Sequence, residues 1–149
     1  MNKNYFMSCA IEQAKKALSC DDVPIGAVIV KDGEIIAEAH NTKEKENCSI
    51  CHAEINAIFE ATSKLKNWRL CDCDMYVTLE PCPMCMGAIL NSRVSNLYIS
   101  AKDAKAGACG SVIDLNSYPL NHKCNVEYGL YKSESLELLN KFFKKKRLK

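Results

Sequence analysis

The stretch MYVTLEPCPMCMGAILNSRVSNLYIS, residues 75–100, decides the fold class. It begins with an apolar, β-strand-forming run at 75–79 and ends with a second one at 96–100. Residues 83–91 between them predict a short helix, because Pro83 fits a first helical turn, where its missing N–H costs nothing. Strands separated by a helix indicate a central sheet covered by helices, so we expect an α/β protein.

The same alternation continues on both sides of this stretch. Apolar periodicity predicts the other elements in chain order: a helix at 4–19, strands at 23–30 and 34–40, a helix at 52–65, a strand at 123–130 and a last helix. Asp32-Gly33 predicts a hairpin turn, which would make the sheet mixed. In the helix at 52–65 we expect Ile55, Ile58 and Phe59 on one face. We expect Ser133 to cap the last helix, with Leu136, Leu139 and Phe143 along one side.

Length and composition are those of one folded domain. With 149 residues, 48% hydrophobic and 26% charged, the chain can bury a core without staples, so we expect one domain over 1–149. The N-terminus lacks the apolar segment of a signal peptide, and no run approaches the ~18 apolar residues of a membrane span. We therefore expect a cytoplasmic protein with no membrane partner, whose ten cysteines stay reduced.

The segment PCPMC (81–85) predicts half of a metal site. Cys82 and Cys85 are three residues apart at a helix start, so they face the same way, and the helix dipole favours their thiolate forms. His52 opens another helix upstream. One imidazole and two thiolates are a ligand set of catalytic zinc, whose fourth position is left for water. We predict that His52, Cys82 and Cys85 bind one zinc ion per chain.

Glu54 follows His52 by two residues, about 200° around a regular helix. It is poorly placed to bind the same ion, and we predict instead that it moves protons to and from the bound water. His-x-Glu followed by Pro-Cys-x-x-Cys is the signature already known from zinc-dependent nucleobase deaminases.

Spacing alone also allows a structural site. Cys48-x-x-Cys51 with Cys82-x-x-Cys85 could form a closed four-cysteine zinc site. Two features weigh against it: the pairs flank predicted helices, and such a site gives no reason for His-Ala-Glu to follow. The other cysteines lack ligand spacing, and we expect them to be core or surface residues: Cys9, Cys20, Cys71, Cys73, Cys109 and Cys124.

The C-terminal KFFKKKRLK (141–149) holds six of the 20 basic residues. Such a cluster can bind phosphate groups. On charge alone a solvated helix end is the simpler interpretation, because cations suit a helix C-terminus.

Taken in order, these motifs resemble the bacterial tRNA-specific adenosine deaminases of the cytidine deaminase-like superfamily, from about Tyr5 to Arg147. The metal motif alone is shared with cytidine, deoxycytidylate and guanine deaminases. The more specific segments are DDVPIGAVIV (21–30), MYVTLEPCPMCMGAILNSRV (75–94), AKDAKAGACGSVIDL (101–115), LNHKCNVEYG (120–129) and FFKKKR (142–147).

The resemblance implies a three-layer α/β/α fold with a five-stranded mixed sheet and a basic C-terminal helix at about 133–147. It implies a homodimeric zinc enzyme that converts the wobble adenosine of a tRNA anticodon loop, typically of an arginine tRNA, to inosine and releases ammonia. Glu54 would be its proton shuttle. The residues that it implies for RNA contact are Asn41, Asp103, Asn121, Phe143, Lys146 and Arg147.

One segment departs from the family pattern. Cys48-Ser49-Ile50-Cys51 stands where many relatives have Asp-Pro-Thr-Ala, which affects expected contacts around the target base but not the predicted metal ligands. Two other functions remain open at this point. One is a deaminase of free guanine or cytosine; the other is a zinc-stapled RNA-binding module, in which Glu54 would be dispensable.

Overall fold

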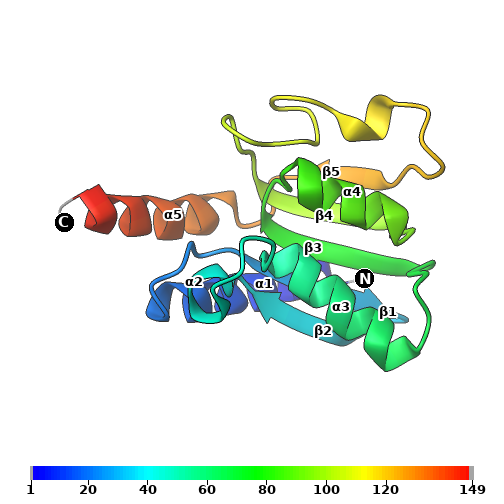
Figure 1. Cartoon of the computed structure of the whole chain (residues 1–149), viewed down its shortest axis with the longest axis horizontal. Helices are drawn as coiled ribbons and strands as arrows, with labels where there is room; N and C mark the ends of the chain where they lie inside the picture. Colours follow the sequence, from blue (N-terminus) through cyan, green and yellow to red (C-terminus); the bar gives the residue numbers. More distant parts are fainter. Residues whose placement is uncertain (1, 148–149) are drawn as a thin grey trace.

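The computed structural model describes residues 2–147 and contains the predicted alternation of helices and strands (Figure 1). Its elements are α1 (Lys3–Ser19), β1 (Gly26–Lys31), β2 (Glu34–His40), α2 (Lys43–Glu46), α3 (Ala53–Leu65), β3 (Cys73–Leu79), α4 (Pro83–Asn91), β4 (Asn96–Ala101), the 3-10 helix η1 (Leu115–Ser117), β5 (Asn125–Tyr128) and α5 (Lys132–Arg147). Sequence periodicity did not predict α2 or η1, because elements this short show no period.

The five strands form one mixed sheet in the order β2-β1-β3-β4-β5. Strand β1 pairs antiparallel with both β2 and β3, whereas β4 lies parallel to β3 and β5. Asp32 and Gly33 join β1 to β2 with φ angles of 51° and 78°. Two consecutive positive φ values are those of a type I′ hairpin turn, so the predicted hairpin is confirmed.

Helices cover both faces of the sheet. Helices α1 and α5 pack together on one face, and α3 and α4 pack together on the other, in front of the sheet in Figure 1. Alternate strand residues point to opposite faces of the sheet and so belong to two hydrophobic core clusters. Val28 and Tyr76 belong to the cluster under α1, whereas Ile29 and Met75 belong to the cluster under α3 and α4. The predicted three-layer α/β/α architecture is confirmed.

Helix α3 buries a different face from the one that its large apolar residues suggest. Its buried residues are Ala53, Glu54, Ala57 and Ala61. Ile58 is partly buried and packs against the core, but Phe59 is 74% exposed, so the predicted Ile55-Ile58-Phe59 stripe packs only in part. Small alanine side chains let the helix lie close to the sheet, and this close approach carries Glu54 into the interior.

Helix α5 differs from its prediction in two details. It begins at Lys132, so Ser133 lies inside its first turn and not at the cap. Leu139 and Phe142 are buried, whereas Phe143 is 46% exposed. Phe142 therefore takes the core position that was expected for Phe143, and the ring of Phe143 remains available on the surface.

Candidate active site

The site forms where the first turns of α3 and α4 meet. His52 and Cys82 are the N-caps of these two helices, and both have an extended backbone. Pro83 occupies the start of α4, as predicted. Because α3 and α4 pack side by side, their N-termini bring together residues that are thirty positions apart in the sequence.

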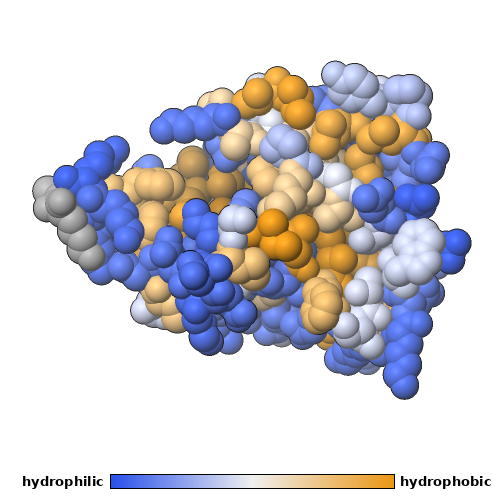
Figure 2. All heavy atoms as spheres, viewed as in Figure 1, coloured by the Kyte–Doolittle hydropathy of each residue, from blue (hydrophilic) through white to orange (hydrophobic). Residues whose placement is uncertain are grey.

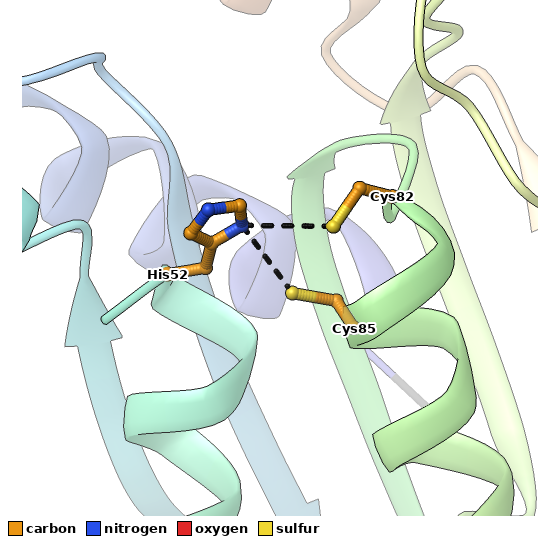
Figure 3. Close-up of side chains that lie close together, drawn as sticks. All are labelled: His52, Cys82 and Cys85. Atoms are coloured by element: carbon orange, nitrogen blue, oxygen red, sulfur yellow. Dashed lines mark hydrogen bonds between the residues drawn. The ribbon is translucent and has the colours of Figure 1, made fainter. Parts of the chain in front are cut away.

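The three predicted metal ligands converge (Figure 3). Nδ1 of His52 lies 3.7 Å from Sγ of Cys82 and 3.5 Å from Sγ of Cys85. All three ligand atoms lie within 4.8 Å of one another, so this group could hold a metal ion. Within residues 2–147 no other group of three or more such side chains is this close, and Cys48 and Cys51 lie outside it. The described residues thus form no four-cysteine site.

The ligand side chains strongly influence one another's protonation. A hydrogen bond with the Cys85 thiol is the main cause that lowers the pKa of Cys82 to about 4. The same contact, followed by burial, raises the pKa of Cys85. A hydrogen bond with Cys82 raises the pKa of His52. A bound cation requires both thiolates and therefore displaces the Cys85 proton.

Glu54 is a buried carboxyl group that faces this cluster. It is 3% exposed, and its Oε1 atom has no hydrogen-bond partner among the described residues. Burial raises its pKa from 4.5 to about 7, although the neighbouring His52 lowers it in part. Unsatisfied buried polar atoms are rare in folded proteins and call for an explanation. A carboxyl group that titrates near neutral pH can both accept and return a proton.

Side-chain amides tie the end of β2 to the start of α3. Oδ1 of Asn41 accepts a hydrogen bond from the Ala53 N–H at 2.8 Å. The Asn56 amide donates to the His40 carbonyl and to the Thr42 hydroxyl, each at 3.0 Å. Asn41 therefore supports the helix that carries Glu54. Sequence patterns gave no signal for Asn56, because only the fold places it against β2.

A cavity of about 870 Å³ opens beside His52. Most of its walls come from α5, from residues 102–105 after β4 and from the segment between β2 and α3, and residues before β1 and at the end of β3 complete them. The lining residues that can contact a ligand through charge, amide or ring are Asn41, Lys43, Lys102, Asp103, Lys105, Asn140, Phe143, Lys146 and Arg147. Five of these are cationic and one is acidic, so the cavity suits a polyanion.

The cavity includes most of the residues predicted for substrate contact but not Asn121. That residue is exposed and lines a separate hollow together with Asn91 and Arg93. Its neighbour His122 hydrogen-bonds through Nε2 with the Val94 carbonyl at 2.7 Å, a structural role. Contact between Asn121 and RNA stays a prediction, and the fold of one chain places this residue apart from the cavity.

Sequence reasoning missed Glu80, which follows β3 and is 2% exposed. Burial by itself raises the pKa of Glu80. Hydrogen bonds from the Ser111 hydroxyl and from the backbone N–H groups of Asp103, Cys109 and Ser111 lower it by more than burial raises it, so the pKa lies below its ordinary value. The signal in the sequence was an acidic residue directly after a buried strand. Its partners lie more than twenty residues away, so the pattern around Glu80 could not reveal them.

Two helix N-termini that share a His-Cys-Cys group, with a buried glutamate beside that group, are the arrangement known from the zinc-dependent nucleobase deaminases. The comparison with known families agrees: the model of the MafB19-like deaminases matches residues 1–147. The chain belongs to this deaminase family.

Individual relatives show which members of the family this chain resembles. The tRNA-specific adenosine deaminase of Bacillus subtilis is 46% identical over 145 residues, which cover 97% of this chain and 90% of the relative. A solved structure from studies of A-to-I editing by tRNA:A34 deaminases at the wobble position of transfer RNA aligns with a TM-score of 0.90 and 43% identity, and the match covers 92% of this chain and all of that one. Guanine deaminase from B. subtilis aligns with a TM-score of 0.68 and 33% identity over 97% of this chain and 95% of that chain. The resemblance to tRNA-specific adenosine deaminases is thus confirmed.

Proposed function

We propose that this protein hydrolyses the wobble adenosine of a tRNA anticodon loop to inosine and releases ammonia. The observation that carries the proposal is the buried Glu54 carboxyl, which has an unpartnered oxygen beside three metal-ligating side chains. The basic cavity next to them suits an RNA chain. The similarity to tRNA-specific adenosine deaminases supports adenosine in tRNA over a free base.

Zinc is the metal that we assign to His52, Cys82 and Cys85, at one ion per chain. The donor set supports this choice, because two thiolates and one imidazole are typical of zinc, and three protein ligands leave a position for water. When bound, zinc supplies water activation near neutral pH, since it lowers the pKa of water toward ~7.

Glu54 carries the protons of the reaction. Its carboxylate takes a proton from the attacking water, whose oxygen adds to C6 of adenine. Glu54 then gives that proton to the ring nitrogen next to C6. It next takes the remaining proton from the added oxygen and transfers it to the departing amino group. The C6–N bond breaks, ammonia leaves, and inosine remains. A pKa of about 7 suits both halves of this exchange, because the group is neither fully protonated nor fully ionised at neutral pH.

The cavity residues bind and orient the RNA in this proposal. The target base must leave its stack to reach Glu54, which is easiest in a single-stranded loop. Asn41 contacts the target nucleotide, and Asp103 meets the neighbouring sugar. The exposed ring of Phe143 offers a stacking surface, and Lys146 and Arg147 neutralise phosphates. Asn121 would contact RNA only beyond the cavity.

The wider setting belongs to the same proposal. We propose an arginine tRNA as the substrate, a cytoplasmic location and a single deaminase domain over residues 1–149, of which α5 forms the basic end. No helix within residues 2–147 combines the length and apolar character that a membrane crossing requires.

We also propose that two copies of the chain form a homodimer. Apolar side chains gather on the surface over α3 and α4 in the view of Figure 2. Phe59 in α3, Met84 in α4 and Ile50 just before α3 are large apolar side chains that are exposed in one chain. Contiguous apolar surface of this kind is typical of interfaces. Light scattering should give the mass of a dimer, and Phe59→Asp should reduce it to that of one chain.

The decisive experiment compares three substrates on one zinc-analysed preparation. They are an anticodon stem-loop with adenosine at the wobble position, the same stem-loop with cytidine there, and free guanine. We expect inosine from the first and no product from the others. Turnover of guanine would support the free-base alternative. One zinc per chain without turnover of any substrate would support the RNA-binding module.

A further inference from the structure

Glu80 is a buried carboxylate that the reaction does not use. It stands between the end of β3 and the Pro81-Cys82 step that begins the metal-binding helix. It is 2% exposed, and its own N–H donates to the Ala101 carbonyl at 2.8 Å. A buried charge is costly unless it is paired or hydrogen-bonded. No cation pairs with it among residues 2–147, so its hydrogen bonds must compensate the burial.

The Glu80 carboxylate accepts hydrogen bonds from backbone N–H groups of one loop, residues 102–111. Oε1 accepts from the Asp103 N–H at 3.1 Å and from the Ser111 hydroxyl at 2.5 Å. Oε2 accepts from the Cys109 N–H at 2.9 Å and from the Ser111 N–H at 3.1 Å. Both ends of the loop therefore bond to one side chain, which acts as the centre around which the loop folds.

Gly107 shows how closely the loop surrounds the carboxylate. A Cβ atom at this position would lie 2.4 Å from both the Glu80 carboxyl carbon and Oε2. The next residue, Ala108, donates its N–H to the Pro81 carbonyl at 2.8 Å. The loop is thus bonded to the peptide that leads into Cys82, so a movement of the loop would displace this peptide as well.

The same loop forms a wall of the substrate cavity. Lys102, Asp103 and Lys105 line it. The Asp103 carboxylate is itself fixed, because Oδ1 accepts hydrogen bonds from the N–H groups of Lys105 and Ala106 at 3.0 and 3.2 Å. The backbone of Asp103, which bonds to Glu80, therefore determines where these charged side chains face the cavity.

We propose that Glu80 is a positioning residue for substrate binding, which holds the loop 102–111 at a fixed place relative to the metal-binding end of α4. This inference rests on the proposed function, because it assigns the loop to RNA contact. Glu80 touches neither the substrate nor the metal ligands in this role and acts through the loop alone.

The test is Glu80→Gln, which keeps the shape of the side chain but turns one acceptor oxygen into an amino group that faces N–H donors. We expect hydrogen exchange of the amides at 103, 109 and 111 to accelerate at least ~10-fold, since each loses its partner or its fixed geometry. The KM for the adenosine stem-loop should rise ~10-fold, with kcat within about threefold and zinc content unchanged, because only uniform binding is lost. The matched control is Glu127→Gln, an exposed carboxylate that pairs with Lys3.

Unchanged exchange in this loop, an unchanged KM, a fall in kcat alone, or loss of zinc would each overturn the proposal. If Glu80→Gln does not fold, Ser111→Ala decides, because it removes only the hydroxyl donor; we expect KM to rise about threefold and the loop amides to exchange faster. Hydrogen exchange needs no substrate. A wild-type protein that fails to deaminate the stem-loop would therefore refute the proposed function, while the exchange rates would still decide whether Glu80 holds the loop.

Discussion

Replacing Glu54 with glutamine separates two effects of this side chain: its contribution to turnover and the effect of its burial on the stability of the folded protein. Glutamine has the same shape but cannot take up or release a proton near neutral pH. We expect turnover of the adenosine stem-loop to fall at least ~100-fold, the lower end of what a general acid–base group contributes. Zinc content and RNA affinity should stay at wild-type values, because the ligands and the cavity wall are unchanged.

The same substitution should stabilise the folded protein. Burial raises the pKa of Glu54 from 4.5 to about 7. At 1.36 kcal/mol for each pH unit, this corresponds to roughly 3 kcal/mol of lost stability above pH 7. The buried glutamine amide keeps a desolvation cost of ~1–2 kcal/mol. The net gain is then about 1–2 kcal/mol, or ~2–8 °C in Tm for a domain of this size.

The sign of the pH dependence follows from the raised pKa. The folded state holds the Glu54 proton more tightly than the unfolded state, so the wild-type protein loses stability as the pH rises from about 4.5 to 7. Glu54→Gln lacks this loss. Near pH 4, where the wild-type carboxyl is mostly protonated in both states, the amide cost of ~1–2 kcal/mol should leave the variant less stable than the wild type. Above pH 7 the variant should be the more stable protein, by about 1–2 kcal/mol.

Thermal unfolding between pH 4 and 8, with chelator present, measures the stability difference. Inosine formation by the zinc-loaded protein measures turnover. The matched control is Glu60→Gln, an exposed glutamate on the same helix, which should match the wild type in both assays. A Tm no higher than wild type at pH 7.5 would refute the energetic argument. Turnover within about threefold of wild type would refute the proton role.

The remaining predictions test the ligands, the support of α3 and the basic helix. Cys82→Ser should lose the metal while Cys48→Ser keeps both metal and turnover, as metal analysis will show; loss in Cys48→Ser would revive the four-cysteine site. Asn41→Ala should lower the free energy of unfolding in urea by about 1–2 kcal/mol, because the Ala53 N–H loses its acceptor. Neutralising Lys146 and Arg147 together should reduce the slope of log affinity against log salt by ~1.4, at ~0.7 for each single-strand phosphate contact. A slope equal to that of the wild type in a fluorescence binding series would contradict their contact with RNA.

The sequence by itself determined the longer helices and the strands, and the chemistry of the candidate metal-binding group. Strand and helix periods arise from residues that are near neighbours in the chain, so β2, α4 and the Asp32-Gly33 turn could be predicted from local pattern alone. His52, Cys82 and Cys85 could be predicted because ligand type, ligand number and a helix start are all visible in short motifs. The three-layer mixed sheet followed from the order of those elements and from the family resemblance.

Only the tertiary structure decided which surfaces face one another. Helix α3 offered a large apolar stripe, yet its alanine face packs on the sheet, because close approach of the helix to the sheet fits small side chains there. That choice buries Glu54 and leaves Phe59 outside. The place of Asn121 outside the cavity and the bonds of Glu80 to residues 103–111 depend on contacts between distant segments. Such contacts leave no period in the sequence, since each partner looks ordinary among its own neighbours.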